Sequence, residues 1–172
     1  VTLGLNNQTY TGSVSSNSVT ITISTTDLQA LSEGTNTITA DVSDVAGNAA
    51  SQSSTTFVYD KTSPSISSIT LSWGTVLNAT EDNNNGTVTV ATSGVEDGQT
   101  VTLGLNSRTY TGSVSSNSVS ITISATRLQE LVDGITYTLT ADVSDVAGNA
   151  ATQLSTTFTY DKSAPSISSI TC

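Results

Sequence analysis

The side chains with the clearest chemical potential in this sequence are acids and amides in short turns. One such turn reads DVSDVAGN, another reads GVEDG, and a further acid precedes a lysine in YDK. Their oxygen atoms are of the kind that Ca²⁺ binds, with six to eight ligands at about 2.3–2.6 Å. The candidate calcium ligands are therefore Asp60, Glu96, Asp97, Asp142, Asp145 and Asn149.

Other kinds of chemistry lack the residues that they need. The sequence contains no His, so it offers no Ser-His-Asp triad, no Cys-His pair and no imidazole ligand for a metal. It also has no Gly-rich loop followed by Lys that would bind phosphate. Its many serines have no base to activate them, so the sequence predicts that the protein is not an enzyme.

Charge and hydropathy narrow the class of partner. The net charge is −10, and a surface of that sign repels nucleic acid and anionic lipid. No apolar run is long enough to cross a bilayer, so we expect no membrane insertion by this segment. Thr, Ser, Asn, Val and Gly dominate the sequence, and this mixture favours strands and turns.

The sequence repeats itself. Residues 1–71 return from residue 101 with about 55 identities in about 71 aligned positions and one extra residue after Gly134. The first copy lacks the 37 residues or so that precede the second copy of VTLGL. We expect a window on a longer array: the C-terminal part of one domain (1–63), a complete domain (64–164) and the first strand of a following domain (165–172).

Alternation of apolar and small polar residues predicts an all-β fold. Tyr137, Leu139 and Ala141 are predicted to point inward, as are Ile135 and Val143 at the ends of their strand. Seven strands in about 100 residues predict tandem immunoglobulin-like β-sandwich domains, the first of them without its opening strands. The predicted strands are 66–73, 87–91, 100–105, 108–114, 119–124, 135–143 and 152–160, with one helical turn within 125–134.

Two phrases carry a family resemblance. The chain resembles the bacterial Ig-like repeats that form the extender region of large cell-surface adhesins. The resemblance rests on ADVSDVAGNAA, which is followed by TTFTYDKSAPSI in the second copy and by TTFVYDKTSPSI in the first. The resemblance implies a secreted bacterial surface protein of many tandem domains, often held straight by calcium. It implies a structural spacer whose partners are the neighbouring repeats of the same protein.

The fold class predicts where the candidate ligands meet. In a seven-strand sandwich, the chain entry, the loop between strands two and three, and the last loop lie at one pole. This arrangement would bring Asp60 to the acids of the loop 94–98 and the hairpin 142–149, where calcium would clamp two domains together. The same turn recurs in the first copy with Asp41, Asp44 and Asn48. The alternative is an ordinary hairpin turn with Asn149 in a left-handed conformation.

Other hypotheses stay open. The turn 81–86 (EDNNNG) resembles a calcium loop poorly and is predicted to be a solvated turn, while Asp133 is a weaker candidate for an additional ligand. Trp73 and the tyrosines would serve a glycan- or protein-binding module if they were exposed. Segment 165–172 would complete the first domain of another chain if the protein formed filaments by strand exchange.

Overall fold

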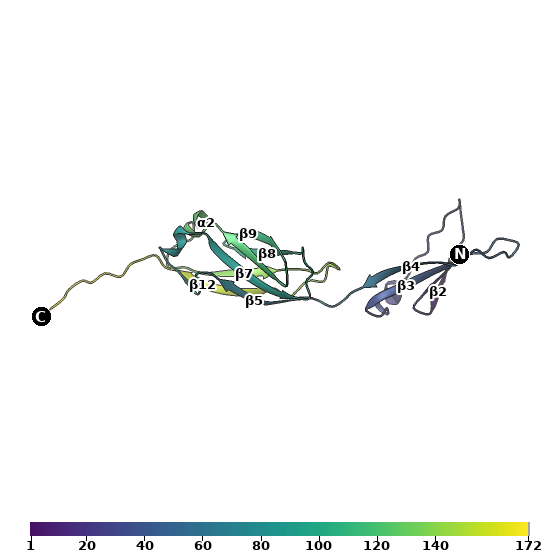
Figure 1. Ribbon diagram of the computed structural model, residues 1–172, viewed down its shortest axis with the longest axis horizontal. Helices are drawn as coiled ribbons and strands as arrows, with labels where there is room; N and C mark the ends of the chain where they lie inside the picture. The colour runs from purple at the N-terminus through teal and green to yellow at the C-terminus, as the bar shows by residue number, and fades with distance from the viewer. Residues whose placement is uncertain (172) are drawn as a thin grey trace. The chain divides into compact units, whose positions relative to one another are not determined.

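The computed structural model describes residues 1–171, which form two compact units (Figure 1). Unit 1 comprises Val1–Lys61, and unit 2 begins at Thr62. Each unit has its own strands and its own α-helix. That the units belong to a longer array of domains stays a prediction.

Unit 2 is a β-sandwich of two sheets. One sheet has the strand order β10-β7-β5, and the other has the order β6-β12-β11-β8-β9. All strand pairs are antiparallel except β6 with β12. The elements are β5 (Ser65–Leu71), β6 (Val76–Leu77), the 3-10 helix η1 (Glu81–Asn83), β7 (Gly86–Ser93), β8 (Thr100–Leu105), β9 (Arg108–Ser113), β10 (Ser118–Ile123), α2 (Ala125–Gln129), β11 (Thr136–Asp142) and β12 (Leu154–Tyr160).

The core of unit 2 lies between these sheets and follows from the alternation of its strands. In β7 and β10 every second residue is buried, whereas the residues between them are half-buried or exposed and, apart from Ala91, polar. Aromatic residues close one end of the core, where Trp73 packs edge-on against Phe158 with ring centroids 5.3 Å apart. The inward prediction for β11 is confirmed at Leu139 and Ala141, which are fully buried.

Three features of unit 2 differ from the prediction. It has eight strands rather than seven, because the two-residue strand β6 is too short to show an alternation pattern. The helix η1 was not predicted. Ile135, predicted to point inward, is 46% exposed because it lies beyond the end of β11.

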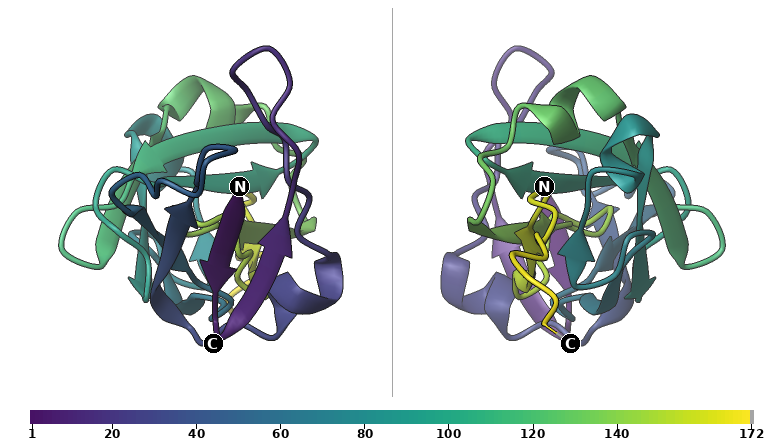
Figure 2. Two further views of the ribbon diagram at one scale, coloured as in Figure 1. Left: turned by 90° about the vertical axis from the view of Figure 1, so that its right-hand side faces the viewer. Right: turned by 90° about the vertical axis from the view of Figure 1, so that its left-hand side faces the viewer.

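Unit 1 contains one sheet only, with the order β2-β1-β3-β4. The segment between β2 and α1 forms no regular strand and extends away from the sheet (Figure 2). Within it, Ser15 and Ser18 form an isolated bridge, and Gly12 exchanges backbone hydrogen bonds with Val1. The elements are β1 (Thr2–Leu5), β2 (Gln8–Thr11), α1 (Thr25–Gln29), β3 (Gly34–Asp41) and β4 (Ser53–Tyr59).

Tight hairpin turns recur at matching positions of the two units. Asn6 and Asn7 both have positive φ angles, and so do Asn106 and Ser107 in unit 2. Two consecutive left-handed residues define the type I′ turn, whose twist matches that of the strands it joins. Asn tolerates this conformation better than most residues do, which explains why the turn forms without glycine.

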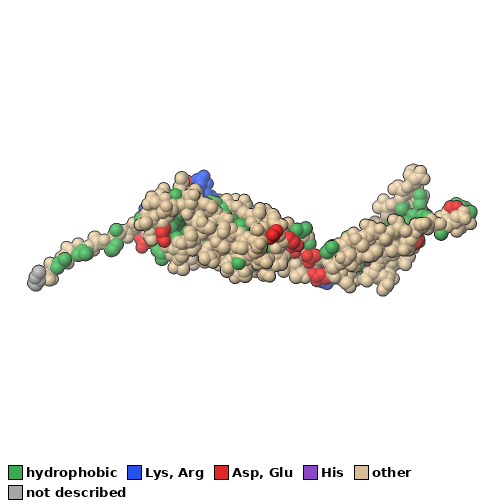
Figure 3. Space-filling model, viewed as in Figure 1, with side chains coloured by type: hydrophobic (Ala, Val, Ile, Leu, Met, Phe, Trp, Pro, Cys, Tyr) green, Lys and Arg blue, Asp and Glu red, His purple; other side chains and the backbone are tan. Residues whose placement is uncertain are grey.

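Unit 2 has two distinct poles. The entry pole carries the start of β5 and the loops 94–99, 114–117 and 143–153, and the exit pole carries α2, η1 and the end of β12. Residues 161–171 leave unit 2 at the exit pole (Figure 1). On the face that Figure 3 shows, acidic side chains gather at these poles and are sparse on the flank between them.

The segment predicted to begin a following domain forms no strand over residues 165–171, and Cys172 lies outside the described residues. A following domain therefore stays a prediction. Over residues 1–171, no helix has the length and apolar character needed to span a membrane.

Candidate functional site

The loop between β7 and β8 crosses the entry pole of unit 2 and carries two of the predicted ligands. The Glu96 carboxylate accepts a hydrogen bond from the backbone N–H of Val146, at 3.1 Å. The adjacent Asp97 carboxylate accepts one from the backbone N–H of Ser116, at 2.7 Å. These two acids therefore hold two different loops, one between β11 and β12 and the other between β9 and β10.

Asp145 and Asn149 form a closed turn of their own. The Asp145 carboxylate accepts from the backbone N–H of Asn149 at 2.7 Å and from its side-chain amide at 2.9 Å. Burial favours the neutral acid, but the hydrogen bonds from Asn149 outweigh burial and lower the pKa of Asp145. The left-handed residue of the turn is Gly148, with φ +93°, so the prediction of a left-handed Asn149 is wrong.

The same turn forms in unit 1. Asp44 accepts from the backbone and the side-chain amide of Asn48, both at 2.8 Å, and these bonds lower the pKa of Asp44. Asp41 accepts from the side chain of Gln52. The turn therefore holds its geometry through its own side chains, in both copies.

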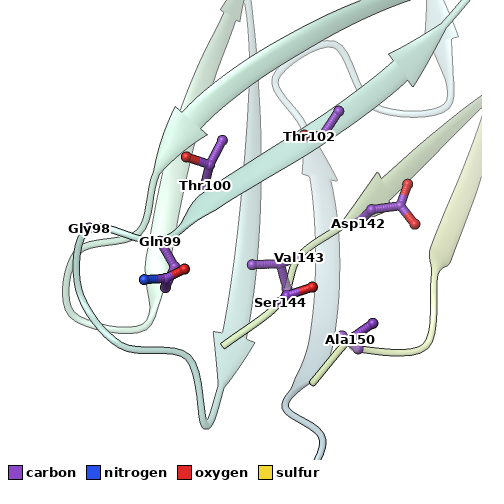
Figure 4. A pocket seen from close by; sticks show the side chains of 9 residues that line it. Gly98, Gln99, Thr100, Thr102, Asp142, Val143, Ser144 and Ala150 are labelled. Carbon is purple, nitrogen blue, oxygen red and sulfur yellow. The ribbon is translucent and has the colours of Figure 1, made fainter. Parts of the chain in front are cut away.

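Asp142 is directed to a different partner. Both of its carboxylate oxygens accept from the side-chain amide of Gln153, at 2.9 Å. The residue lines an open groove of about 320 Å³ between the edges of β8 and the last loop. In Figure 4, Gln99 and Thr100 lie on the opposite side of the groove, and the Asp142 carboxylate points away from them. Asp142 is the one charged residue among those that line this groove. The groove therefore does not bring several charges together.

The structure thus brings only part of the predicted ligand set together. Glu96 lies next to Asp145 through its hydrogen bond to Val146, whereas Asp97 and Asp142 are engaged elsewhere. Asp60 belongs to unit 1. Within residues 1–171 no three or more His, Cys, Asp or Glu side chains form a group that could hold a metal ion. The ligand assignment therefore stays a prediction.

The turn 81–86 is built into the fold. Asp82 is only 6% exposed and accepts a hydrogen bond from the hydroxyl of Tyr160. Burial, followed by the bond to Asp82, raises the pKa of Tyr160 to about 12. Asn83 accepts from the side chain of Gln129 on α2. The prediction of a solvated turn is therefore wrong at Asp82, whose partner lies 78 residues away and leaves no local sequence signal.

Sequence reasoning also missed a contact at the exit pole. The Asp133 carboxylate accepts from the backbone N–H of Lys162 at 2.8 Å and from the hydroxyl of Ser163 at 2.6 Å. The bond from Ser163 is the largest cause of the lowered pKa of Asp133. One carboxylate thus fixes the first residues that follow β12. The only sequence signal is an acid one residue before a turn glycine.

The aromatic residues of unit 2 form no exposed platform for a sugar. Trp73 is 6% exposed, Tyr160 is fully buried, and Tyr110 and Tyr137 pack against the core. Stacking on a carbohydrate requires an accessible ring face. The binding-module hypothesis loses its candidate residues in this unit.

The sequence matches a known protein family over most of its length. The model of the bacterial Ig-like domain (group 3) matches residues 20–165. The chain belongs to this family. Its match spans parts of both units, so the family assignment covers most of the sequence.

Two solved structures resemble this bacterial Ig-like chain. One is of the Ca²⁺-stabilized adhesin that helps an Antarctic bacterium reach out and bind ice, with 28% identity, a TM-score of 0.54, and coverage of 95% of this chain and 40% of that one. The other concerns host cell surface retention of a 1.5-MDa bacterial ice-binding adhesin, with 26% identity, a TM-score of 0.53, and coverage of 94% and 52%. The chain therefore spans about half or less of the length of these relatives. No curated protein matches it in sequence.

Proposed function

We propose that this chain is a spacer segment of a bacterial surface adhesin, in which tandem Ig-like repeats set the distance between the cell and a binding module. The observation that carries the proposal is the repeat itself. In the two copies of one sequence, strands β1–β4 match β8, β9, β11 and β12, and the same Asp-Asn bonds form in both. A part whose number sets a length needs this kind of duplication. The likeness to two adhesin structures supports the same role.

We further propose that calcium stiffens the junction between successive repeats. Glu96, Asp145 and Asn149 supply a partial set of oxygen atoms at the entry pole, and Asp60 just before the junction is proposed to add a further carboxylate. Ca²⁺ takes six to eight oxygens, so backbone carbonyls or water would complete its coordination. The printed description of one relative as Ca²⁺-stabilized supports this choice of ion.

Distance measurements between the units test both proposals. Spin labels on Thr37→Cys in β3 and Thr157→Cys in β12, in a chain with Cys172→Ser, would report the inter-unit distance distribution by pulsed electron resonance. We expect a narrow distribution with Ca²⁺ and a broad one with chelator. An equal width in both conditions removes the calcium clamp, and a broad distribution in both contradicts a spacer of defined length.

A matched set of variants locates the ion. Glu96→Gln and Asp145→Asn each remove one negative charge at the entry pole and should abolish the narrowing by Ca²⁺. Asp27→Asn removes the same charge from the first turn of α1 and should leave the narrowing unchanged. Equal effects of all three variants would mean that Ca²⁺ acts through net charge rather than at this site.

A further inference from the structure

Strand β9 is the last strand of the five-stranded sheet in unit 2 and pairs with β8 alone. Its register with β8 is continuous from Arg108 opposite Leu105 to Ser113 opposite Thr100. Within residues 1–171 no strand pairs with the other side of β9. Unit 2 contains both sheets of its sandwich, so this edge stays open in a sandwich that has all its layers.

The backbone groups of alternate residues in β9 face the open edge. A two-residue turn joins β8 to β9, so the residues that flank the turn exchange both hydrogen bonds and the alternation continues along the hairpin. Val114 keeps the same phase, because its N–H donates to Gln99 and its C=O accepts from Gly98. The N–H and C=O groups that point away from β8 are therefore those of Thr109, Thr111 and Ser113.

This edge lacks the devices that protect the other margins of unit 2. Proteins protect open edges with bulges, prolines, lysines or very short strands. Strand β5 has a register shift between Ile66 and Ser68, and β6 is two residues long. Strand β10 packs beside β9, where a Cβ built at Gly112 would lie 2.6 Å from Val119. Strand β9 has the sequence RTYTGS, without proline or register shift, and Arg108 at its first position is its one charged residue.

The side chains at the open edge suit a neutral strand as partner. The three residues whose backbone faces the edge are all exposed and carry short hydroxyl side chains. Hydroxyls of this kind already pair across strands in unit 2, where the Oγ1 atoms of Thr136 and Thr159 lie 3.0 Å apart. Such cross-strand pairs stabilise a sheet. Strand β9 contains no acid, although the chain has a net charge of −10.

We infer that β9 is a contact surface at which two copies of this protein pair side by side, each adding its edge strand to the sheet of the other. Antiparallel pairing centred on Thr111 uses all the free backbone groups, because it places Thr109 opposite Ser113 of the other copy. This pairing is two-fold symmetric and self-complementary, so it needs no second kind of partner. It places the two Arg108 residues about 20 Å apart along the strands, where their repulsion is largely screened.

Unit 1 offers the same edge. The sequence TYTGS occurs at 9–13 and at 109–113 with the same pattern of exposure. Val1 and Gly12 exchange both backbone hydrogen bonds, so the alternation in β2 has the same phase as in β9. Two edges in one chain strengthen the pairing of copies by avidity. The net charge of −10 opposes this pairing, so we expect the association to tighten as salt screens the charge.

Sedimentation equilibrium of the full chain with Cys172→Ser tests the inference. We expect a reversible self-association that tightens between low salt and about 0.5 M NaCl. The double variant Thr11→Lys/Thr111→Lys sets like charges opposite each other at the centre of each edge and should weaken the association at least about tenfold. The control Thr37→Lys/Thr138→Lys adds the same charges at exposed positions of the inner strands β3 and β11 and should stay within about threefold of the parent chain. Trp73 fluorescence verifies that each variant is folded.

Disulfide trapping fixes the register. A chain with Thr111→Cys and Cys172→Ser should form a covalent dimer on mild oxidation, because Cα atoms of directly opposed residues lie about 5.5 Å apart. Chains with Thr109→Cys and Ser113→Cys should cross-link to each other when mixed, whereas Thr138→Cys should not dimerise. Four results would overturn the inference: a parent chain that stays monomeric at every concentration, an association that weakens with salt, equal weakening by the two lysine variants, or equal cross-linking at 111 and 138.

Discussion

Residues 18–23 of unit 1 and 118–123 of unit 2 have nearly the same sequence and different structures. In unit 2 the segment is strand β10, paired along its length with β7. In unit 1 the three apolar residues of the segment are the same, but no strand lies beside them. Strand propensity describes how a segment fits a partner surface, so the difference comes from the presence of β7 and not from local preference.

A second pair gives the same lesson with identical sequences. The hexapeptide SISSIT is most of β5 at residues 65–70, where Ile66 is 9% exposed. At residues 166–171 it forms no strand, and Ile167 and Ile170 are each 85% exposed. By contrast, the turn at Asp44 and the turn at Asp145 make the same hydrogen bonds in both units. Turns here are local structures, whereas strands depend on distant partners.

The largest test of this comparison is a matched pair of core truncations. Ile121→Ala should destabilise unit 2 by about 2–5 kcal/mol, because the side chain is buried between β7 and the opposite sheet. Ile21→Ala should cost unit 1 less than about 1 kcal/mol, because much of the side chain is already in water. Trp73 is the only tryptophan and lies in unit 2, so its fluorescence during urea unfolding reports that unit alone.

Hydrogen exchange at residues 34–41 measures unit 1 in the same samples. Comparable losses in the two units would mean that the face of unit 1 is covered in solution.

The next test concerns the buried pair at the exit pole. Tyr160→Phe leaves the Asp82 carboxylate without its hydroxyl partner and should destabilise unit 2 by about 2 kcal/mol. Tyr59→Phe should have a smaller effect, because unit 1 has no counterpart of Asp82.

The same pair predicts an alkaline transition. The pKa of Tyr160 is raised above the ordinary 10.0 to about 12, so folding favours the neutral phenol. Its contribution to stability should be complete below pH 10 and lost as the pH rises towards 12. Urea unfolding between pH 9 and 12 checks this, and an equal alkaline loss in the Tyr160→Phe chain would contradict the assignment.

The sequence predicted the sandwich and the order of its main strands because alternation over five or more residues leaves a clear pattern in segments such as 100–105. It did not predict β6, whose two residues show no alternation, nor the Tyr160–Asp82 bond, whose members are far apart in the chain. Convergence of the acids was predicted from topology alone. Topology identifies a pole but not the direction of a side chain, which explains why Asp97 and Asp142 meet other partners.

A smaller effect is expected where the chain leaves unit 2. Asp133→Asn should loosen Lys162 and Ser163, because a neutral amide accepts more weakly than a carboxylate. Heteronuclear NOE values of these two amides should fall in the variant while those of β12 stay constant. In the parent chain the order should persist below pH 3.8, since the folded pKa of Asp133 is lowered, and should be lost as the pH falls through that lower value. Unchanged NOE values in the variant would show that β12 alone holds this segment.

The smallest expected effect comes from a charge cluster present in one unit only. Glu130 on the exit pole bonds to Arg108 at 2.9 Å and to Arg127 at 2.6 Å, and all three side chains are more than a third exposed. In unit 1, Ala30 takes the place of Glu130, and Gln8 and Asp27 take the places of Arg108 and Arg127. Asp27 instead interacts with Tyr10, whose pKa is raised by burial first and by Asp27 second.

Glu130→Ala should therefore destabilise unit 2 by only about 0.5–1 kcal/mol at low salt, and the loss should shrink in 0.5 M NaCl because exposed pairs are screened. The reciprocal change Ala30→Glu has no arginine to meet and should leave the stability of unit 1 within about 0.5 kcal/mol of its starting value. Urea unfolding at two salt concentrations separates the cases. A loss above about 2 kcal/mol that salt leaves unchanged would mean that Glu130 supports α2 by packing rather than by charge. Glu130 would then stabilise the exit pole of unit 2 by a packing contact that Ala30 does not make in unit 1.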